Sequence, residues 1–370
     1  MTGGARGPVS PTVAAAAFQP RALSLARRWR RMRKNELARQ VGVTAAAISQ
    51  YELGQVRPSA AVLARLALAL SMPVEFFAAA FPAPAMAGQA HFRSLRATSQ
   101  AERDQAEAFG EIARRVVEVI ESHIRLPELR LPHLDLPDAS TSADLQTVAA
   151  SARDAFSVGA GPVGHMVRLL EAHGVIVLTL PEVSDRVDAF SHWYGQRPYV
   201  FASPSKNDKA RSRMDAAHEL AHLLLHHDAE PGSQILERQA TAFASEFLAP
   251  TNVLGDELPT RLDFDRLHEL KRRWGISLKA LIYRGHAIGV YREHSYRRGM
   301  NLLAEWGDPE PGDIGPRETP SLLGKAVDLL AGQQFSVHDV AAQTTLPTTL
   351  VQAVIEAGSD PRPRLTITAL

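Results

Sequence analysis

The amino-acid sequence predicts a mainly α-helical protein with one small β-sheet, an α+β arrangement. Over most of the 370 residues, apolar side chains recur at helical spacing, and Gly or Pro stands at the breaks. Between residues 174 and 202 the pattern changes to short apolar runs, which predict buried strands at 174–180, 188–191 and 197–202. At about 150 residues per domain, the length predicts two or three domains.

The composition is typical of a soluble globular protein, with 45% hydrophobic and 22% charged residues. Because cysteine is absent, disulfides are excluded and any metal must be held by histidine and carboxylate side chains. The absence of cysteine also fits a cytoplasmic protein. The N-terminus has no signal-peptide pattern, and no uncharged apolar run reaches about 18 residues, so no membrane segment is expected.

The formal net charge of +1 conceals an uneven distribution. Residues 18–82 carry ten Lys or Arg and only three acidic residues, a net charge of +7. The rest of the chain, Arg6 aside, has a net charge of −7. A basic domain joined to an acidic remainder favours a local anionic partner, and nucleic acid is the leading candidate. A solvated charged surface is the alternative.

The first 82 residues divide into a tail and a helical domain. Residues 1–17 are rich in Gly, Pro and Ala and are expected to be disordered. Residues 18–82 predict five helices, at 21–31, at 35–41, at 45–53, from 58 onward and after residue 73. Thr44 is a good N-cap for the third helix, and Gly42 and Gly54 are suited to end the second and third.

The order of residues in this domain resembles the XRE, or phage-repressor-like, helix-turn-helix family. The resemblance is carried by Leu37-Ala38, Gly42-Val43-Thr44, Ile48-Ser49, Tyr51-Glu52, Gly54 and Arg57-Pro58-Ser59. It implies that the third helix enters the major groove of double-stranded DNA while the second braces it. Because one domain contacts one half-site, a homodimer is expected. A role in dimerisation alone is the alternative.

The same resemblance implies individual DNA contacts. Recognition-helix positions are occupied by Thr44, Ala45, Ala46 and Gln50, and the positions for phosphate contact by Arg33, Lys34 and Arg57. Gln50 can hydrogen-bond an adenine edge, and the two alanines can touch thymine methyl groups. Family members often carry Gln, Arg or Ser where this chain has alanine. We therefore expect phosphate charge and DNA shape to supply more of the binding than base contacts.

Residues 83–150 are expected to form a helical connector. A short Pro/Ala linker is followed by apolar residues at helical spacing between 101 and 124, which predict one long amphipathic helix. Three Leu-Pro steps between 126 and 137 then exclude regular helix. The long helix is expected to bridge the domains or to pair two protomers, and packing within one chain is an equal alternative.

The segment from Ala216 to His222 reads Ala-Ala-His-Glu-Leu-Ala-His and contains a His-Glu-x-x-His motif. On a helix, His218 and His222 lie one turn apart on one face, so both imidazoles can reach one metal ion. Glu219 is placed to take a proton from a water that the metal activates. On a helical wheel both histidines lie at the edge of the apolar arc and Glu219 further out, while His226 lies too far along the axis to share the ion. An ordinary helix with two surface histidines is the alternative.

A third metal ligand is expected from the next helix, because a catalytic zinc usually takes three protein ligands and keeps one position open. That helix is predicted to begin near Ser233 and offers Glu237 and Glu246, which point to opposite sides of it. Glu237 flanks the apolar arc and Glu246 lies away from it, so Glu237 is the better ligand. A surface acid near a helix N-terminus is the alternative interpretation.

Two blocks of sequence resemble the ImmA/IrrE family of metallopeptidases: the run 217–226, and the run 237–240 followed by 243–250. The resemblance implies a zincin-like, zinc-dependent endopeptidase domain, assigned to residues 151–300, that acts on repressor-type or antitoxin-type regulators. Carried over by position, His218, His222 and Glu237 are zinc ligands and Glu219 is the general base. The family often has a second Glu where Gln239 stands, so Glu237 is the only acid of that pair.

Residues 301–370 are expected to form a small helical region. Helices are predicted just before it, at 264–273 and 278–289, and the Gly/Pro-rich run 307–313 is expected to be a linker. Residues 335–354 have the pattern of another helix–turn–helix. Because few basic residues lie there, protein packing is expected rather than DNA contact.

The sequence supports two functional hypotheses. In the first, the protein is a cytoplasmic DNA-binding regulator whose zinc peptidase domain cleaves a regulatory protein, either a partner or the chain itself near residues 82–90, in a stress or phage-type response. In the second, it is a transcription factor that uses the peptidase fold as a metal or ligand sensor. The intact motif favours the first hypothesis, because a sensor has no need of Glu219.

Overall fold

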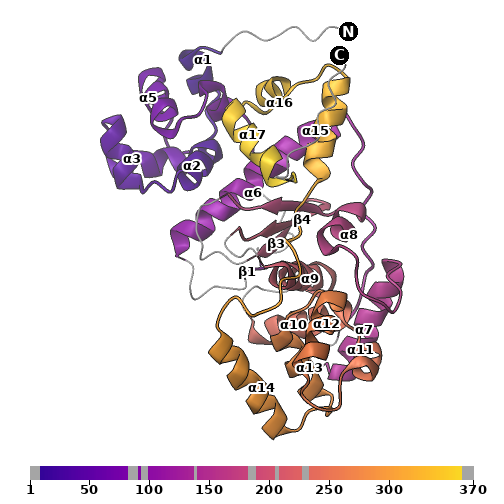
Figure 1. Cartoon of the computed structure of the whole chain (residues 1–370). Coiled ribbons are helices and arrows are strands. Elements are labelled where there is room, and N and C mark those ends of the chain that lie inside the picture. Colours follow the sequence, from indigo (N-terminus) through magenta and orange to yellow (C-terminus); the bar gives the residue numbers. More distant parts are fainter. Residues whose placement is uncertain are drawn as a thin grey trace, which may run out of the picture. The chain divides into compact units, whose positions relative to one another are not determined.

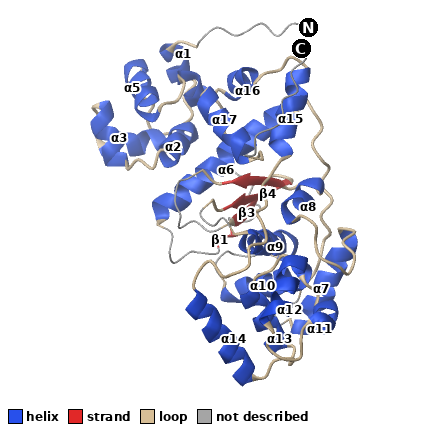
Figure 2. Cartoon of the chain, viewed as in Figure 1, coloured by secondary structure: helices blue, strands red, loops and turns tan. Residues whose placement is uncertain are grey.

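The computed structural model describes residues 9–81, 91–92, 99–136, 140–181, 189–204, 208–226 and 233–360 of the chain (Figure 1). This part is mainly helical with one small sheet, which confirms the predicted fold class (Figure 2). The chain divides into two compact units. Unit 1 comprises Met1–Ala85, Arg96–Leu126 and Leu323–Ser359, and unit 2 comprises Met86–Leu95, Pro127–Leu322 and Asp360–Leu370.

Unit 1 contains the predicted helical domain. Its elements within residues 9–81 are α1 (Pro11–Ala16), α2 (Pro20–Trp29), α3 (Lys34–Val41), α4 (Ala45–Glu52), α5 (Ala60–Leu70) and the 3-10 helix η1 (Val74–Ala78). Thr44 caps α4 by accepting a hydrogen bond from the Ala47 amide, and Gly42 ends α3 in the left-handed conformation. The apolar faces of α2 to α5 are buried, as the periodicity predicted.

The expectation that residues 1–17 are disordered is wrong from residue 11 onward, where α1 begins. Ser10 caps α1, and Pro11 occupies its first turn. Ala14 and Phe18 are buried, and the helix packs against α5 and η1. Composition did not predict α1 because its side chains are small and their burial depends on elements far along the chain. Residues 1–8 lie outside the described residues.

The long amphipathic helix, α6 (Gln100–Glu121), packs within unit 1 of the same chain. A capping box of Ser99 and Glu102 begins it. Its Glu111 accepts hydrogen bonds from two residues of α2, Arg21 at 2.7 Å and Arg28 at 2.8 Å. The structure therefore shows the third of the expected arrangements, packing within one chain.

The last three helices, α15 (Leu322–Gly332), α16 (Val337–Thr344) and α17 (Thr348–Ala357), belong to unit 1 with α6. Arg115 of α6 donates to the Thr344 carbonyl oxygen at 2.6 Å, and the rings of His123 and Phe335 lie 3.9 Å apart. The expected regions 83–150 and 301–370 are therefore each divided between the two units. The reason is that α16 and α17 pack on α6, and α6 packs on α2.

Unit 2 contains a sheet with the strand order β1-β3-β4-β2. β1 (His91–Phe92) and β3 (Phe190–Tyr194) pair antiparallel, β3 and β4 (Arg197–Ala202) pair antiparallel, and β4 and β2 (Ile176–Thr179) pair parallel. The three strands predicted between residues 174 and 202 are present, although residue 188 lies outside the described residues. β1 was not predicted, because two residues carry no strand pattern.

The helices of unit 2 are α7 (Ser142–Ala155), α8 (Met166–Ala172), α9 (Lys209–Leu225), α10 (Gln234–Leu248), α11 (Thr251–Glu257), α12 (Phe264–Trp274), α13 (Leu278–Ala287) and α14 (Glu293–Trp306). α9 contacts β3 and β4 and also packs against α8 and α10 (Figure 1). Every residue of α9 from 216 to 224 is buried. α9, the helix that carries the motif, is therefore enclosed on several sides, so the polar residues of the motif are buried.

The segment 307–321, which includes the linker expected at 307–313, is an ordered part of unit 2 that contacts several of its helices. Glu310 accepts a hydrogen bond from the buried Lys271 at 2.8 Å and another from the first amide of α13 at 2.6 Å. Glu318 is paired with Arg213, and its carboxylate accepts hydrogen bonds from the first two amides of α8. The segment thus supplies two acids, Glu310 and Glu318, that hold four helices of unit 2, α8, α9, α12 and α13.

Candidate metal centre and DNA-binding face

The His-Glu-x-x-His motif lies in the second half of α9, and Glu237 lies in the first turn of α10. Asp208 caps α9, and Ser233 caps α10, so both helices begin at side chains that accept a backbone hydrogen bond. α9 and α10 pack against each other in unit 2. This packing brings the first turn of α10 beside the motif.

The donor atoms of His218, His222 and Glu237 converge. His218 Nε2 lies 3.2 Å from Glu237 Oε2, His222 Nε2 lies 3.4 Å from Glu237 Oε1, and the two Nε2 atoms are 3.1 Å apart. One nitrogen or oxygen from each of the three residues lies within 4.8 Å of the others. The structure therefore brings together the three residues that the sequence predicted as a ligand set.

The surroundings of Glu237 favour its ionised form. Burial alone would raise the pKa of this carboxyl group. Hydrogen bonds from His218 and His222 outweigh burial and hold the pKa of Glu237 well below its ordinary value. An ionised carboxylate is the form that binds a cation.

The three residues fit a zinc ion by their chemistry. Two imidazole nitrogens and one carboxylate oxygen form the three-ligand set of catalytic zinc sites, which leave a fourth position for water. The histidines are 0% and 2% exposed, which excludes the alternative of a surface histidine pair. The two nitrogens of the His218 ring have different partners: Nδ1 lies 3.3 Å from Thr241 Oγ1, and Nε2 faces Glu237. The contact with Thr241 helps to orient the ring.

The predicted placement of Glu219 is wrong in one respect. The helical wheel put this residue outside the apolar arc, but it is 1% exposed, because β3 covers that side of α9. Ser191 of β3 donates a hydrogen bond from Oγ to Glu219 Oε2 at 2.7 Å. Ser191 lies in a strand that the sequence predicted, but no sequence signal connected it with Glu219.

Glu246 and His226, which the sequence analysis excluded as metal ligands, both have other polar partners. Glu246 accepts hydrogen bonds from Arg284 at 2.8 Å and from the Thr251 amide at 3.0 Å. His226 forms the C-cap of α9. It is 3% exposed, and its Nδ1 lies 3.0 Å from His222 Nδ1.

The predicted DNA-contacting residues lie mostly on exposed parts of unit 1. The exposed members are Arg33, Thr44, Ala45, Ala46, Gln50 and Arg57. Lys34 is less available, because its Nζ lies 3.2 Å from Glu52 Oε2 and also donates to Ser49 Oγ at 3.2 Å. The exposed Arg57 side chain donates to the Ala16 carbonyl oxygen at 2.8 Å, which steadies it beside α1.

Part of the basic charge in residues 18–82 is paired inside unit 1. Three arginines at or near α2 pair with acids of α6: Arg21 with Glu111, Arg28 with Glu107 and Glu111, and Arg31 with Glu102. Arg27 pairs with Glu52 of α4 at 2.6 Å. The net charge of +7 therefore overstates the positive charge that this domain presents to an anionic partner.

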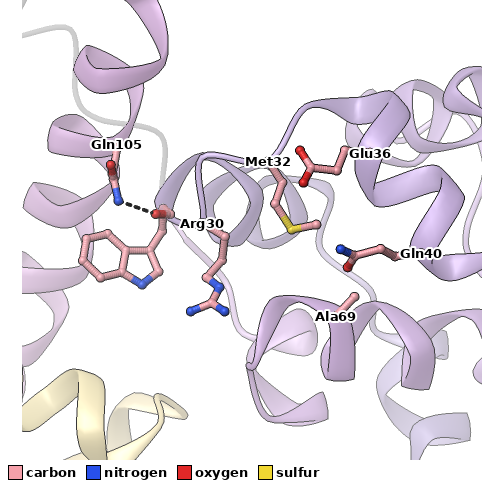
Figure 3. Close-up of a pocket in the computed structure, with 7 residues that line it drawn as sticks. Arg30, Met32, Glu36, Gln40, Ala69 and Gln105 are labelled. Carbon is pink, nitrogen blue, oxygen red and sulfur yellow. Dashed lines mark hydrogen bonds between the residues drawn. The ribbon is translucent and has the colours of Figure 1, made fainter. Parts of the chain in front are cut away.

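A hollow of about 330 Å³ also lies in unit 1 (Figure 3). It is lined by Trp29, Arg30, Met32, Glu36, Gln40, Ala69 and Gln105. Gln105 Nε2 of α6 donates to the Trp29 carbonyl oxygen at 2.9 Å, which ties α6 to the last residue of α2 (Figure 3). None of the predicted DNA-contacting residues lines this hollow, whose lining residues come from α2, the turn after it, α3, α5 and α6.

Comparison with known families gives two matches. Residues 23–77 match the family described as Helix-turn-helix, and residues 170–286 match the peptidase family described as IrrE N-terminal-like domain. No curated protein matches the chain. Among the described residues, no helix has the length and apolar character needed to cross a membrane. The chain thus joins, in one polypeptide, a segment that matches the XRE-type helix-turn-helix family and a segment that matches the IrrE-like peptidase family.

Proposed function

We propose that this protein is a cytoplasmic transcriptional regulator that carries a zinc-dependent endopeptidase in the same chain. Its substrate is a regulatory protein, either a partner repressor or antitoxin or the chain itself, cleaved in a stress or phage-type response. One observation carries the proposal. In a chain with a helix-turn-helix segment, His218, His222 and Glu237 converge within 4.8 Å, and Glu219 is adjacent to the first of them in the sequence.

The peptidase chemistry follows from the residues of this chain. A zinc ion bound by His218, His222 and Glu237 would polarise a scissile carbonyl and lower the pKa of a water. Glu219 would take the proton of the attacking water and later deliver it to the leaving amine. Ser191 donates to one carboxylate oxygen of Glu219 and so fixes the orientation of that group. The buried position of Glu219 limits the water that can compete for the proton.

The DNA-binding part of the proposal rests on the exposed face of α4. Thr44, Ala45, Ala46 and Gln50 would face base edges in the major groove of double-stranded DNA, and Arg33 and Arg57 would contact phosphates. One chain supplies one such face and would cover one half-site, so the proposed binding form is a homodimer.

A second candidate function keeps the metal but not the cleavage. In that case the peptidase fold is a metal or ligand sensor, and the hydrogen bond from Ser191 gives Glu219 a structural role without turnover. The same observation therefore supports either function, and the two differ in the behaviour of a Glu219→Gln variant.

The deciding experiment incubates purified full-length protein and its Glu219→Gln variant with one equivalent of zinc, together with candidate regulators and with itself. We expect the wild type to cut at least one candidate at a discrete site. The variant should bind zinc equally and cut nothing. Glu246→Gln is the matched control, because Glu246 is engaged with Arg284 and should leave cleavage intact.

The enzyme proposal fails if wild type and Glu219→Gln leave every candidate equally uncut while zinc changes DNA affinity. That result would establish the sensor instead.

A further inference from the structure

A row of hydrogen-bonded polar side chains leads away from the candidate metal centre. It begins at His222, and its other members are not proposed metal ligands. His222 presents Nε2 to His218 and Glu237, and its other ring nitrogen, Nδ1, lies 3.0 Å from His226 Nδ1. His226 Nε2 lies 3.1 Å from Gln239 Oε1. Gln239 Nε2 in turn donates to Ser140 Oγ at 3.0 Å.

The directions of these hydrogen bonds follow from their donors. The amide oxygen of Gln239 can only accept, so His226 carries its proton on Nε2. A neutral His226 then has a lone pair on Nδ1, and it accepts from the Nδ1–H of His222. When an ion takes the place of the Nε2 proton that hydrogen-bonds Glu237, His222 would keep its proton on Nδ1 and present the lone pair of Nε2 to the ion.

This row of side chains is enclosed. His226 is 3% exposed and Gln239 is 7% exposed. Its members come from three separate places: the C-cap of α9, the first half of α10 and the residue before the N-cap of α7. Buried polar groups that are hydrogen-bonded in a fixed direction are costly to disturb, so the orientation of the His222 ring is well determined.

We infer that His226 is a positioning residue for the metal centre, and that Gln239 acts through it. His226 selects the tautomer of His222 and holds its ring, so that Nε2 is presented to the ion without rearrangement. Gln239 in turn selects the tautomer of His226. This inference rests on the proposed zinc site.

Residues of this kind typically change metal affinity by about 10–100-fold when they are replaced. The variant that removes the acceptor is His226→Leu, which leaves an apolar side chain in a buried position. The conservative variant is His226→Asn, whose amide oxygen is bonded to Cγ as Nδ1 is and can accept from His222. Gln239→Met removes the partner of His226 and leaves the contact between the two histidines.

The test measures the zinc Kd of each full-length variant by competition with a chromogenic chelator, and the visible absorption of the Co²⁺-substituted protein. We expect His226→Leu to weaken zinc binding by about 10–100-fold and to shift the Co²⁺ spectrum. His226→Asn should stay within a few-fold of wild type, and Gln239→Met should fall between them. His286→Leu is the control, because His286 lies on α13 and contacts the Tyr291 carbonyl oxygen.

The outcomes separate this inference from the proposed function. If the wild type binds no zinc, the metal site itself is wrong and the inference falls with it. If the wild type binds zinc and His226→Leu binds it equally, only the positioning role is overturned. Equal losses in His226→Leu and His226→Asn would also overturn it, because general packing and not the acceptor atom would then be responsible. Should His226→Leu fail to fold without metal, the comparison of His226→Asn and Gln239→Met with wild type decides in the same way.

Discussion

His218 on α9 and Glu237 on α10 are 19 positions apart in the sequence, and their Nε2 and Oε2 atoms lie 3.2 Å apart. We predict that Glu237→Gln weakens zinc binding by more than about 100-fold, because a neutral amide replaces an ionised ligand. This loss is larger than the usual effect of replacing a residue that only hydrogen-bonds a ligand. The measurement is the zinc content after dialysis together with the Kd from chelator competition.

The matched control for this prediction is Glu246→Gln on the same helix. Glu246 is engaged with Arg284 and Thr251, so its replacement should leave zinc binding unchanged. Equal zinc content in the two variants would remove Glu237 from the ligand set.

The choice of His218, His222 and Glu237, which the structure brings together, could be made from the sequence because its determinants are local. The i, i+4 spacing of His218 and His222, and the position of Glu237 at the flank of an apolar arc, are properties of single helices. The burial of Glu219 could not be predicted in this way, because it depends on a strand whose Ser191 lies 28 residues earlier. For the same reason the pairing of Glu310, within the expected linker 307–313, could not be predicted: its partner Lys271 is distant in the sequence.

The proposed DNA-binding face leads to a prediction about the salt dependence of DNA binding. Removal of one phosphate-binding side chain should reduce the slope of log K against log salt by about 1 per chain. Arg33→Ala and Arg57→Ala should each show this change, because both side chains are exposed. Lys34→Ala should show less, because Lys34 is already paired with Glu52. Fluorescence anisotropy with duplex DNA at several salt concentrations measures the slopes.

The control for the salt series is Lys279→Ala, an exposed lysine of unit 2, which should leave the slope unchanged. If Lys34→Ala lowers the slope as much as Arg33→Ala does, the pair with Glu52 opens on binding and Lys34 is a full phosphate contact, contrary to the prediction.

The ion pair of Glu318 and Arg213 predicts that the stable peptidase unit extends past residue 300. Both side chains are 2% exposed, so Glu318→Gln would leave a buried guanidinium without its counter-charge. We expect a loss of about 3–5 kcal/mol in the free energy of unfolding of unit 2, measured by urea denaturation. Glu305→Gln, an exposed acid on α14, should change the free energy by less than about 0.5 kcal/mol.

A double substitution checks the cause of that loss. Arg213→Met combined with Glu318→Gln removes the uncompensated charge and should recover part of the stability that Glu318→Gln alone removes. If the double variant is less stable than Glu318→Gln by the full cost of Arg213→Met alone, the two residues act independently and the explanation by charge is wrong.

The stability of unit 2 should also depend on pH through His165, the N-cap of α8. Burial lowers the pKa of His165 below its ordinary value of 6.5, although Glu318, 3.3 Å away, acts in the opposite direction. The unfolded chain therefore takes up this proton at a higher pH than the folded chain does, and the free energy of unfolding falls as the pH drops through 6.5 and below. Asparagine can cap a helix without titrating, so His165→Asn should lose less stability than wild type between pH 7 and pH 5. Urea denaturation of both proteins at each pH measures the difference, and a difference that does not change with pH would show that His165 does not contribute.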